Sequence, residues 1–249
     1  RIKLNIGGRS VDAVYSAGSG TSVLTFSFTI SDGNSGTQGS GGALSATGST
    51  TVNGGTLALG TFSKTGGAII FAGGTITQTS GTFSPTSLTA TNTSGTQNLD
   101  VTLSGAGSLT MNGAGGTLSV NGTNTAYTGA TTVTAGTLKA GAAGAFGSGT
   151  ITVNGGTFDL NALTLANNIT FNGGMLAGGT FAVSQLTAKG GTVSASLTGT
   201  GALTKTDTGT LTLSAANDFT GGTTINGGTL TFANAVDHLA DAGTVTVNT

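Results

Sequence analysis

The stretch Leu197–Leu230, LTGTGALTKTDTGTLTLSAANDFTGGTTINGGTL, decides the fold of this chain. Apolar residues alternate with Thr or Lys over 202–205 and over 210–213, which is the period of a strand with one buried face. Paired glycines at 221–222 and 227–228 enclose a further short run at 223–225. Three strands of about five residues separated by glycine-rich corners predict one or two coils of a β-solenoid.

Internal repeats extend this prediction along the chain. The heptapeptide TINGGTL at 224–230 recurs as TVNGGTL at 51–57 and as TVNGGTF at 152–158. On a larger scale 103–138 aligns with 197–230, and 149–154 aligns with 243–248 at an offset of 94 residues (248 − 154 = 94). This offset corresponds to about five coils of roughly 20 residues each. Two similar blocks, about 52–150 and 153–249, therefore build a solenoid of about ten coils over 43–249, roughly 50 Å long.

Composition agrees with a solenoid. The chain has 249 residues, of which 36% are hydrophobic and 6% charged, with 47 glycines, one proline and no cysteine. A solenoid needs a thin apolar column, because its backbone hydrogen bonds run from coil to coil. The formal net charge of −1 gives no electrostatic footprint for nucleic acid or an anionic membrane. The apolar run at 68–72 is far too short for membrane insertion.

The solenoid stretch resembles the passenger-associated transport repeat, the autotransporter-type β-strand repeat of large bacterial surface proteins. The resemblance implies a right-handed parallel β-helix in a secreted or surface-anchored protein, and it implies no reaction. Asp207 stands where glycine is usual and Phe219 where tyrosine is usual, and in the first block Met111 takes the place of Lys205. The matching positions are Gly199, Gly201, Leu203, Lys205, Gly209, Leu211, Leu213, Asn217, Phe219, Gly221, Thr223, Ile225, Gly228 and Leu230.

The N-terminal segment has a different pattern. Residues 1–30 contain long apolar–polar alternations with a Gly-Ser-Gly turn at 18–20, which predicts a β-hairpin. Residues 13–30 resemble the last strands of bacterial Ig-like surface repeats. Because thirty residues cannot close a sandwich, the hairpin is expected to cap the first coil, complete an upstream domain or pair with a neighbouring subunit. A Gly/Ser-rich linker, or an extended loop, is predicted over 31–42.

The acidic residues do not form a convincing catalytic site. All eight are aspartates, and no pair recurs at coil spacing. Adjacent turns could make Asp207 and Asp218 neighbours, as hydrolysis of a glycosidic bond by two carboxylates requires, but solvated turn residues are the favoured interpretation. The acidic positions are Asp12, Asp32, Asp100, Asp159, Asp207, Asp218, Asp237 and Asp241.

Two further motifs have some of the residue types of a functional site. Asp237, His238 and Asp241 have the residue types of a metal ligand set or a general base, but the aligned residues Ala145 and Phe146 favour an irregular loop. The glycine-rich 141–149 lacks the Lys-Ser/Thr of a phosphate-binding loop. The sequence therefore predicts no catalytic, cofactor-binding or metal-binding residue and no cofactor.

Three repeated side-chain patterns have structural and functional interpretations. Phenylalanines at 62, 71, 83, 158, 171 and 181 predict an aromatic ladder in the core rather than an exposed sugar-stacking platform. Asparagines at 53, 154, 172 and 226 precede Gly-Gly and are predicted to satisfy corner backbone groups. Thr-x-Thr pairs at 75–79, 150–152, 204–206, 210–212 and 244–246 are typical of solvated strands and also of flat ice-binding arrays.

We expect a non-enzymatic structural or adhesive protein of the bacterial cell surface or extracellular space. A sharper hypothesis is head-to-tail assembly into filaments, through the solenoid ends and the N-terminal hairpin, because 243–249 ends inside a strand-like repeat. Surface glycans or a host surface are the expected ligands. The alternatives are a polysaccharide-binding or polysaccharide-cleaving β-helix and, as a minor alternative, an ice-binding solenoid.

Overall fold

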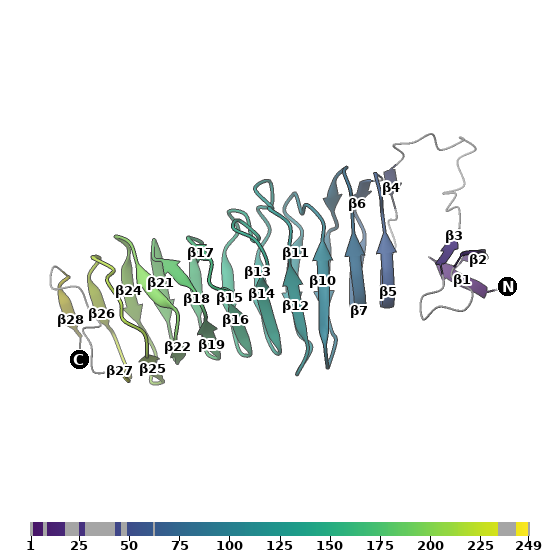
Figure 1. Cartoon of the computed structure of the whole chain (residues 1–249). Coiled ribbons are helices and arrows are strands. Elements are labelled where there is room, and N and C mark those ends of the chain that lie inside the picture. The colour runs from purple at the N-terminus through teal and green to yellow at the C-terminus, as the bar shows by residue number, and fades with distance from the viewer. Residues whose placement is uncertain are drawn as a thin grey trace.

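The computed structural model describes residues 49–61, 63–233 and 243–248, together with the backbone of four strands before residue 49. In this described part the secondary structure consists of strands, without a helix. The strands of the solenoid pair in parallel, each with the equivalent strand of the next coil, into about ten turns (Figure 1). The prediction of an all-β solenoid is confirmed.

The longest row of stacked strands, here called ladder 1, runs through the described coils in eleven strands. Its members pair in order along the rod. They are β5 (Thr50–Ala58), β7 (Ala68–Thr77), β9 (Ser87–Ala90), β11 (Ser108–Met111), β13 (Thr131–Val133), β15 (Ile151–Val153), β18 (Ile169–Phe171), β21 (Gln185–Ala188), β24 (Ala202–Lys205), β26 (Thr223–Ile225) and β28 (Val245–Val247).

Ladder 2 lies one corner further along each coil. The long strands β5 and β7 contribute to both ladders, since their second halves pair with each other and then with β10. From there the ladder continues through β10 (Thr96–Asp100), β12 (Thr117–Val120), β14 (Thr137–Ala140), β16 (Thr157–Asp159), β19 (Met175–Ala177), β22 (Gly191–Val193), β25 (Thr210–Leu213) and β27 (Thr229–Phe232).

The third side of the coil is irregular and forms two short sheets of three strands, here called ladder 3. One contains β4 (Ala43–Ser45), β6 (Ser63–Thr65) and β8 (Phe83–Ser84), and the other contains β17 (Thr164–Leu165), β20 (Thr180–Ala182) and β23 (Ser196–Thr198). Between them single bridges join Phe83 to Leu103 and Gly105 to Tyr127. The rod therefore has two continuous faces and one interrupted face.

The coils differ in length while the ladders stay in register. Leu186 pairs with Leu203, 17 residues further on (203 − 186 = 17), whereas Thr223 pairs with Val245, 22 residues further on (245 − 223 = 22). Five successive pairings on ladder 1 lead from Leu109 to Leu203. The 94-residue repeat therefore spans five coils, as predicted.

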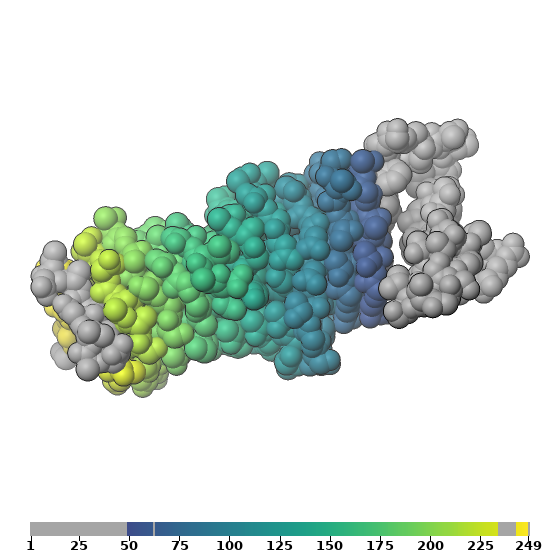
Figure 2. Space-filling view, viewed as in Figure 1, coloured from purple at the N-terminus to yellow at the C-terminus, as the bar shows by residue number. Residues whose placement is uncertain are grey.

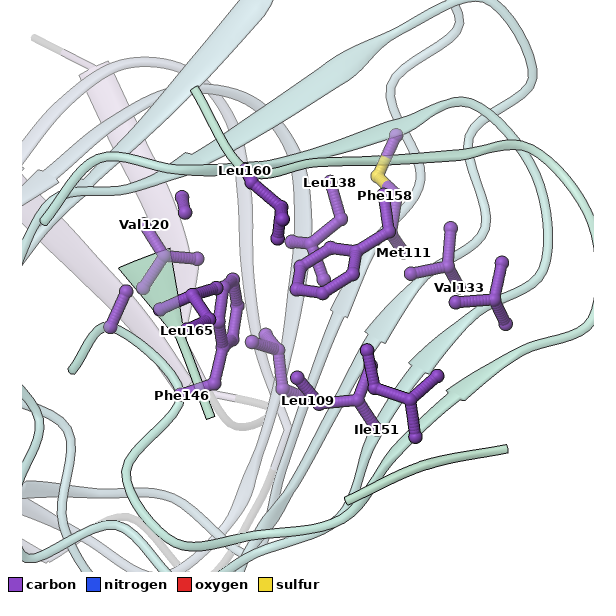
Figure 3. Packing of buried hydrophobic residues seen from close by; sticks show 14 of the residues in the cluster. Leu109, Met111, Val120, Val133, Leu138, Phe146, Ile151, Phe158, Leu160 and Leu165 are labelled. Carbon is purple, nitrogen blue, oxygen red and sulfur yellow. The ribbon is translucent and has the colours of Figure 1, made fainter. Parts of the chain in front are cut away.

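The core is the narrow column enclosed by the three ladders. Most ladder-1 strands bury two residues and turn the residue between them outward, as in β15, where Ile151 and Val153 flank Thr152. Side chains from all three sides meet in this column, for example Leu109, Phe158 and Leu165 (Figure 3). Stacking the coils in this way gives one continuous rod (Figure 2).

Glycine is required at corners where two coils approach closely. A Cβ added to Gly129 would lie 1.9 Å from the carbonyl oxygen of Gly107 in the preceding coil, and one added to Gly149 would lie 1.9 Å from that of Gly129. Because real side chains cannot tolerate such contacts, this column of glycines permits the backbones to stack.

The first three strands form a separate antiparallel sheet. β1 (Ile2–Ile6) pairs with β2 (Arg9–Ala17), and β2 pairs with β3 (Thr25–Ser27) across the segment where a hairpin is predicted. The linker predicted at 31–42 lies outside the described residues. The three expected roles of the N-terminal sheet stay predictions. The domain limits at 30 and 42 stay predictions.

Candidate interaction surface

A row of threonines runs along the outside of ladder 1. The outward residue at the centre of each strand is threonine in nine successive coils, and each lies directly beside the next in the parallel register. We call this row the threonine rank. Its members are Thr89, Thr110, Thr132, Thr152, Thr170, Thr187, Thr204, Thr224 and Thr246.

The threonine rank lies on the surface and carries no charge over the coils that the structure describes. Its side chains are half-buried or exposed, while the residues on either side of each threonine point into the core over most of its length. Neighbouring threonines are separated by the spacing of paired strands, about 4.8 Å. At the N-terminal end Ile70, which is 40% exposed, interrupts the row before Thr51. The face thus presents evenly spaced hydroxyl and methyl groups.

A second, less regular row lies on ladder 2. Its outward residues are threonines at 96, 117, 137, 157, 192, 212 and 231, and Met175 replaces threonine between 157 and 192. Beside this row the side chains of Lys139 and Asp159 occupy paired positions in adjacent coils. Ladder 2 is therefore the more mixed face chemically.

The predicted Thr-x-Thr pairs are divided between two ladders of the solenoid. The pairs at 75–77 and 210–212 lie on ladder 2, whereas those at 150–152 and 244–246 begin one residue ahead of ladder-1 strands. They do not make one array of paired threonines. The relevant signal was a single threonine between two core residues, repeated once per coil, and the sequence reading missed it.

The asparagines before Gly-Gly interact mainly with one another. Nδ2 of Asn172 donates to Oδ1 of Asn154 at 2.7 Å, and Nδ2 of Asn248 donates to Oδ1 of Asn226 at 2.7 Å. Each pair bridges adjacent coils on the edge of the threonine face. Among the described residues no backbone group is bonded by these four side-chain amides, so the prediction that they satisfy the corner backbone is wrong.

A different set of asparagines holds the backbone, and these are buried. Asn217 accepts from the N–H of Leu197 at 2.9 Å, and its Nδ2 donates to the carbonyl of Ala215 at 2.8 Å. Asn124 likewise accepts from the N–H of Leu103 in the preceding coil at 2.7 Å, and its Nδ2 donates to the carbonyl of Ala145 in the next coil at 2.6 Å. These side chains replace inter-coil backbone bonds where ladder 3 is interrupted, because a buried unpaired N–H would be costly.

Lys205 is buried in the ladder-1 core, where its register neighbours are Ala188 and Ile225. Its ammonium donates to the carbonyls of Thr206, Asp207 and Gly227 at 2.6, 2.8 and 3.0 Å. Burial lowers the pKa of Lys205 from its usual 10.5, and the charge of Asp207 opposes this shift. The ammonium joins two coils at a corner and leaves no free group for catalysis.

The structure does not bring the predicted acidic pair together. Asp207 lies at the corner between ladders 1 and 2, against Gly227 of the next coil. Asp218 lies on the ladder-3 side, where its N–H donates to the carbonyl of Leu197. The Oδ1 atoms of Asp100 and Asp159 accept from Asn121 and from the N–H of Asn161. The carboxylates that the structure places therefore serve turns and corners.

The remaining candidate sites lie outside the described residues or consist of core residues. Asp237, His238 and Asp241 lie outside the described residues, as do Asp12 and Asp32. Across the described part no three His, Cys, Asp or Glu residues form a metal-binding group. In the glycine-rich 141–149, Ala145 and Phe146 are buried in the core and no helix follows. The described residues also contain no helix with the length and apolar character needed to cross a membrane.

The phenylalanines are core residues, as expected, but they do not form one ladder. Phe71, Phe83, Phe158, Phe171 and Phe181 are fully buried, and Phe62 lies outside the described residues. They are divided among the three ladders, and Phe158 instead meets Phe146 edge to face, with ring centroids 5.2 Å apart. An exposed stacking platform built from the five described phenylalanines is excluded.

The comparisons with known proteins agree with this architecture. The model of the family described as Passenger-associated-transport-repeat matches residues 40–59, 109–140 and 203–232. The chain is also similar to the "Adhesin BmaC autotransporter" of Brucella suis biovar 1 (strain 1330), with 34% identity over 151 residues. That alignment covers 57% of this chain and 4% of the relative, so the chain spans a small part of the relative's length. No solved structure matches.

Proposed function

Because this chain carries passenger-associated transport repeats, we propose that it is a rigid, non-catalytic segment of an extracellular adhesin at the bacterial cell surface. The similarity to an autotransporter adhesin supports an adhesive role and a surface location. A parallel solenoid suits this role, since stacked coils hold a surface at a fixed distance and orientation.

The observation that supports this proposal best is the threonine rank. Nine aligned hydroxyl groups on one sheet face, without a charged member, favour an uncharged polar ligand such as a neutral surface glycan. Nucleic acid and anionic membranes would require a basic patch, which this rank does not provide. Binding through many weak contacts of equal spacing would increase with the number of coils engaged.

The test is attachment of beads that carry the purified chain to host-type cells and to arrays of neutral glycans. In the test variant Thr152, Thr170 and Thr187 are replaced by valine, which removes three hydroxyls and retains the shape and strand preference of the side chain. The matched control replaces Thr137, Thr157 and Thr192 by valine on ladder 2. We expect the first variant to lose most attachment and the second to retain it. Equal attachment by both variants would show that the threonine rank does not bind the ligand.

Filament assembly is a finer hypothesis within the same function. Val245 and Val247 of β28 are 52% and 61% exposed, and pairing of this strand with another solenoid edge would cover them. Negative-stain electron microscopy and light scattering over a concentration series would test this hypothesis. Filaments that grow with concentration would support it, whereas dispersed monomers at every concentration would rule it out for this chain.

A further inference from the structure

Six Asn-Gly dipeptides lie at the corners of the solenoid, at 53–54, 112–113, 121–122, 154–155, 172–173 and 226–227. Asparagine followed by glycine is the sequence most open to spontaneous deamidation, because glycine has no side chain to obstruct ring closure. Deamidation requires the following backbone nitrogen to reach the side-chain carbon, so local structure controls its rate. The six sites have identical chemistry and different surroundings.

Four of the six asparagines are held by hydrogen bonds. Asn154 and Asn172 bond to each other, and Asn226 accepts from Asn248. Asn121 donates to the carboxylate of Asp100 at 2.5 Å and accepts from the hydroxyl of Ser119 at 2.7 Å. In each case the amide must break a hydrogen bond before its carbon can turn toward the backbone nitrogen.

The glycines after the asparagines are also packed to different degrees. A Cβ placed on Gly113 or Gly122 would lie 1.9 Å from a carbonyl oxygen of the preceding coil, and one on Gly155 would lie 2.8 Å from such an oxygen. Around the corresponding position on Gly54 there is no heavy atom within 4 Å. The Cβ side of Gly54 is therefore open. The corresponding sides of Gly173 and Gly227 are less tightly packed than those of Gly113 and Gly122, with the nearest oxygens at 3.4 and 3.2 Å.

Asn53 combines both kinds of freedom. Its side chain is exposed, and the part of the chain that the structure describes contributes no hydrogen bond to it. The pairing register of β5 also shifts on both sides of Asn53, between Val52 and Asn53 and between Asn53 and Thr56. Such a bulge weakens the ladder locally. Asn112, the other unbonded asparagine, precedes the tightly packed Gly113.

We propose that Asn53 is a modification site, at which the surface protein converts spontaneously to aspartate and isoaspartate while the paired asparagines are protected. The backbone nitrogen of Gly54 loses its proton and bonds to Cγ of Asn53, and the side-chain amide nitrogen leaves as ammonia. The product is a cyclic imide. Water then opens the imide at either carbonyl carbon, which gives aspartate or isoaspartate and places one negative charge beside Thr51.

The experiment follows all six sites in one sample. The folded chain is incubated at mildly alkaline pH, digested at intervals and analysed by peptide mass spectrometry for conversion of amide to acid. We expect Asn53 to convert roughly tenfold faster than Asn154, Asn172 or Asn226, as for sites where one net hydrogen bond must break first. In denaturant all six should convert at similar rates. A folded chain in which Asn53 is no faster than the paired asparagines would overturn the proposal.

Two variants test the stated causes. Gly54→Ala should slow conversion of Asn53 and leave folding intact, because the added methyl meets no neighbour and the φ of Gly54 is not in the left-handed region. Asn248→Ala removes the partner of Asn226 and should raise the rate at Asn226 toward that of Asn53. An unchanged rate at Asn226 would show that the inter-coil hydrogen bond gives no protection.

Discussion

The corner at Asp207 shows how one residue departs from a repeat without breaking it. Asp207 has a φ of 66°, in the left-handed region where the repeat family usually has glycine. Its carboxylate accepts from the N–H of Thr208 at 2.7 Å, and this hydrogen bond lowers the pKa of Asp207. The local hydrogen bond offsets part of the strain, as is common for aspartate in this conformation.

Substitutions at Asp207 separate these effects. Asp207→Gly should leave the free energy of unfolding within about 0.5 kcal/mol, because glycine adopts this φ without strain but loses the hydrogen bond. Asp207→Ala should cost about 1–2 kcal/mol, because alanine has the strain and no compensating acceptor. Urea denaturation of both variants measures the difference. Equal stability of the two variants would show that φ is not the constraint.

Lys205 and Met111 occupy equivalent rungs five coils apart. A Cβ on Gly228 would lie 2.7 Å from the Lys205 nitrogen, and one on Gly136 would lie 2.6 Å from the Met111 methyl carbon, so both side chains reach the same corner. Met111 therefore shows how a methionine fits at a position equivalent to that of Lys205. We expect this variant to fold with the same ladder register and to show the change in pH dependence described next.

The pH dependence of stability isolates Lys205. Because burial lowers its pKa in the folded state, the folded chain binds fewer protons than the unfolded chain between that lowered pKa and 10.5. Stability should therefore rise with pH through this window. Lys64 is also buried, and burial lowers its pKa, so it adds to the rise of stability with pH equally in the wild type and in Lys205→Met. Urea denaturation of wild type and Lys205→Met across the window should show a smaller rise in the variant, and identical slopes would contradict the assignment.

At the scale of strands and corners, the sequence predicts regular ladders well and irregular ones poorly. Alternation with Leu, Ile and Val predicts strands such as β24 and β25. Asn-Gly-Gly predicts the corners that follow β15, β18 and β26, and within β5 it coincides with the register shift at Asn53. Ladder 3 gives little signal, because its two short sheets are separated by single bridges and so supply no strand that repeats in every coil. The threonine rank was missed because it depends on register between coils of 17 to 22 residues, which sequence distance alone does not supply.

The glycine column gives a prediction at this scale. Gly129→Ala should destabilise the chain by about 2 kcal/mol, since the methyl would have to displace the backbone of Gly107. Gly54→Ala, with open space around the added carbon, is the matched control and should change stability by less than about 0.5 kcal/mol. Thermal unfolding distinguishes them. Similar melting of both variants would show that the corner at Gly129 can open.

At the scale of the whole molecule, each coil contacts its neighbours and stability is close to a sum over coils and interfaces. Phe171 fills the core near the middle of the rod, so Phe171→Ala should cost about 4 kcal/mol. Hydrogen exchange should then lose protection most in the coils around 153–188 and least in the coils around 50–90. Uniform loss along the rod would show that the solenoid unfolds as one unit instead.

The parallel ladders also have a mechanical consequence. Their inter-coil hydrogen bonds point along the rod, so the coil interfaces are in series and tension between the two ends of the stack loads all of them equally. The weakest interface yields first. Each coil that comes away would release roughly 20 residues, or about 65 Å of extended chain, at an extension of ~3.3 Å per residue. Under a pulling force such a rod would lengthen in steps, which dissipates the load before an attachment at either end has to break.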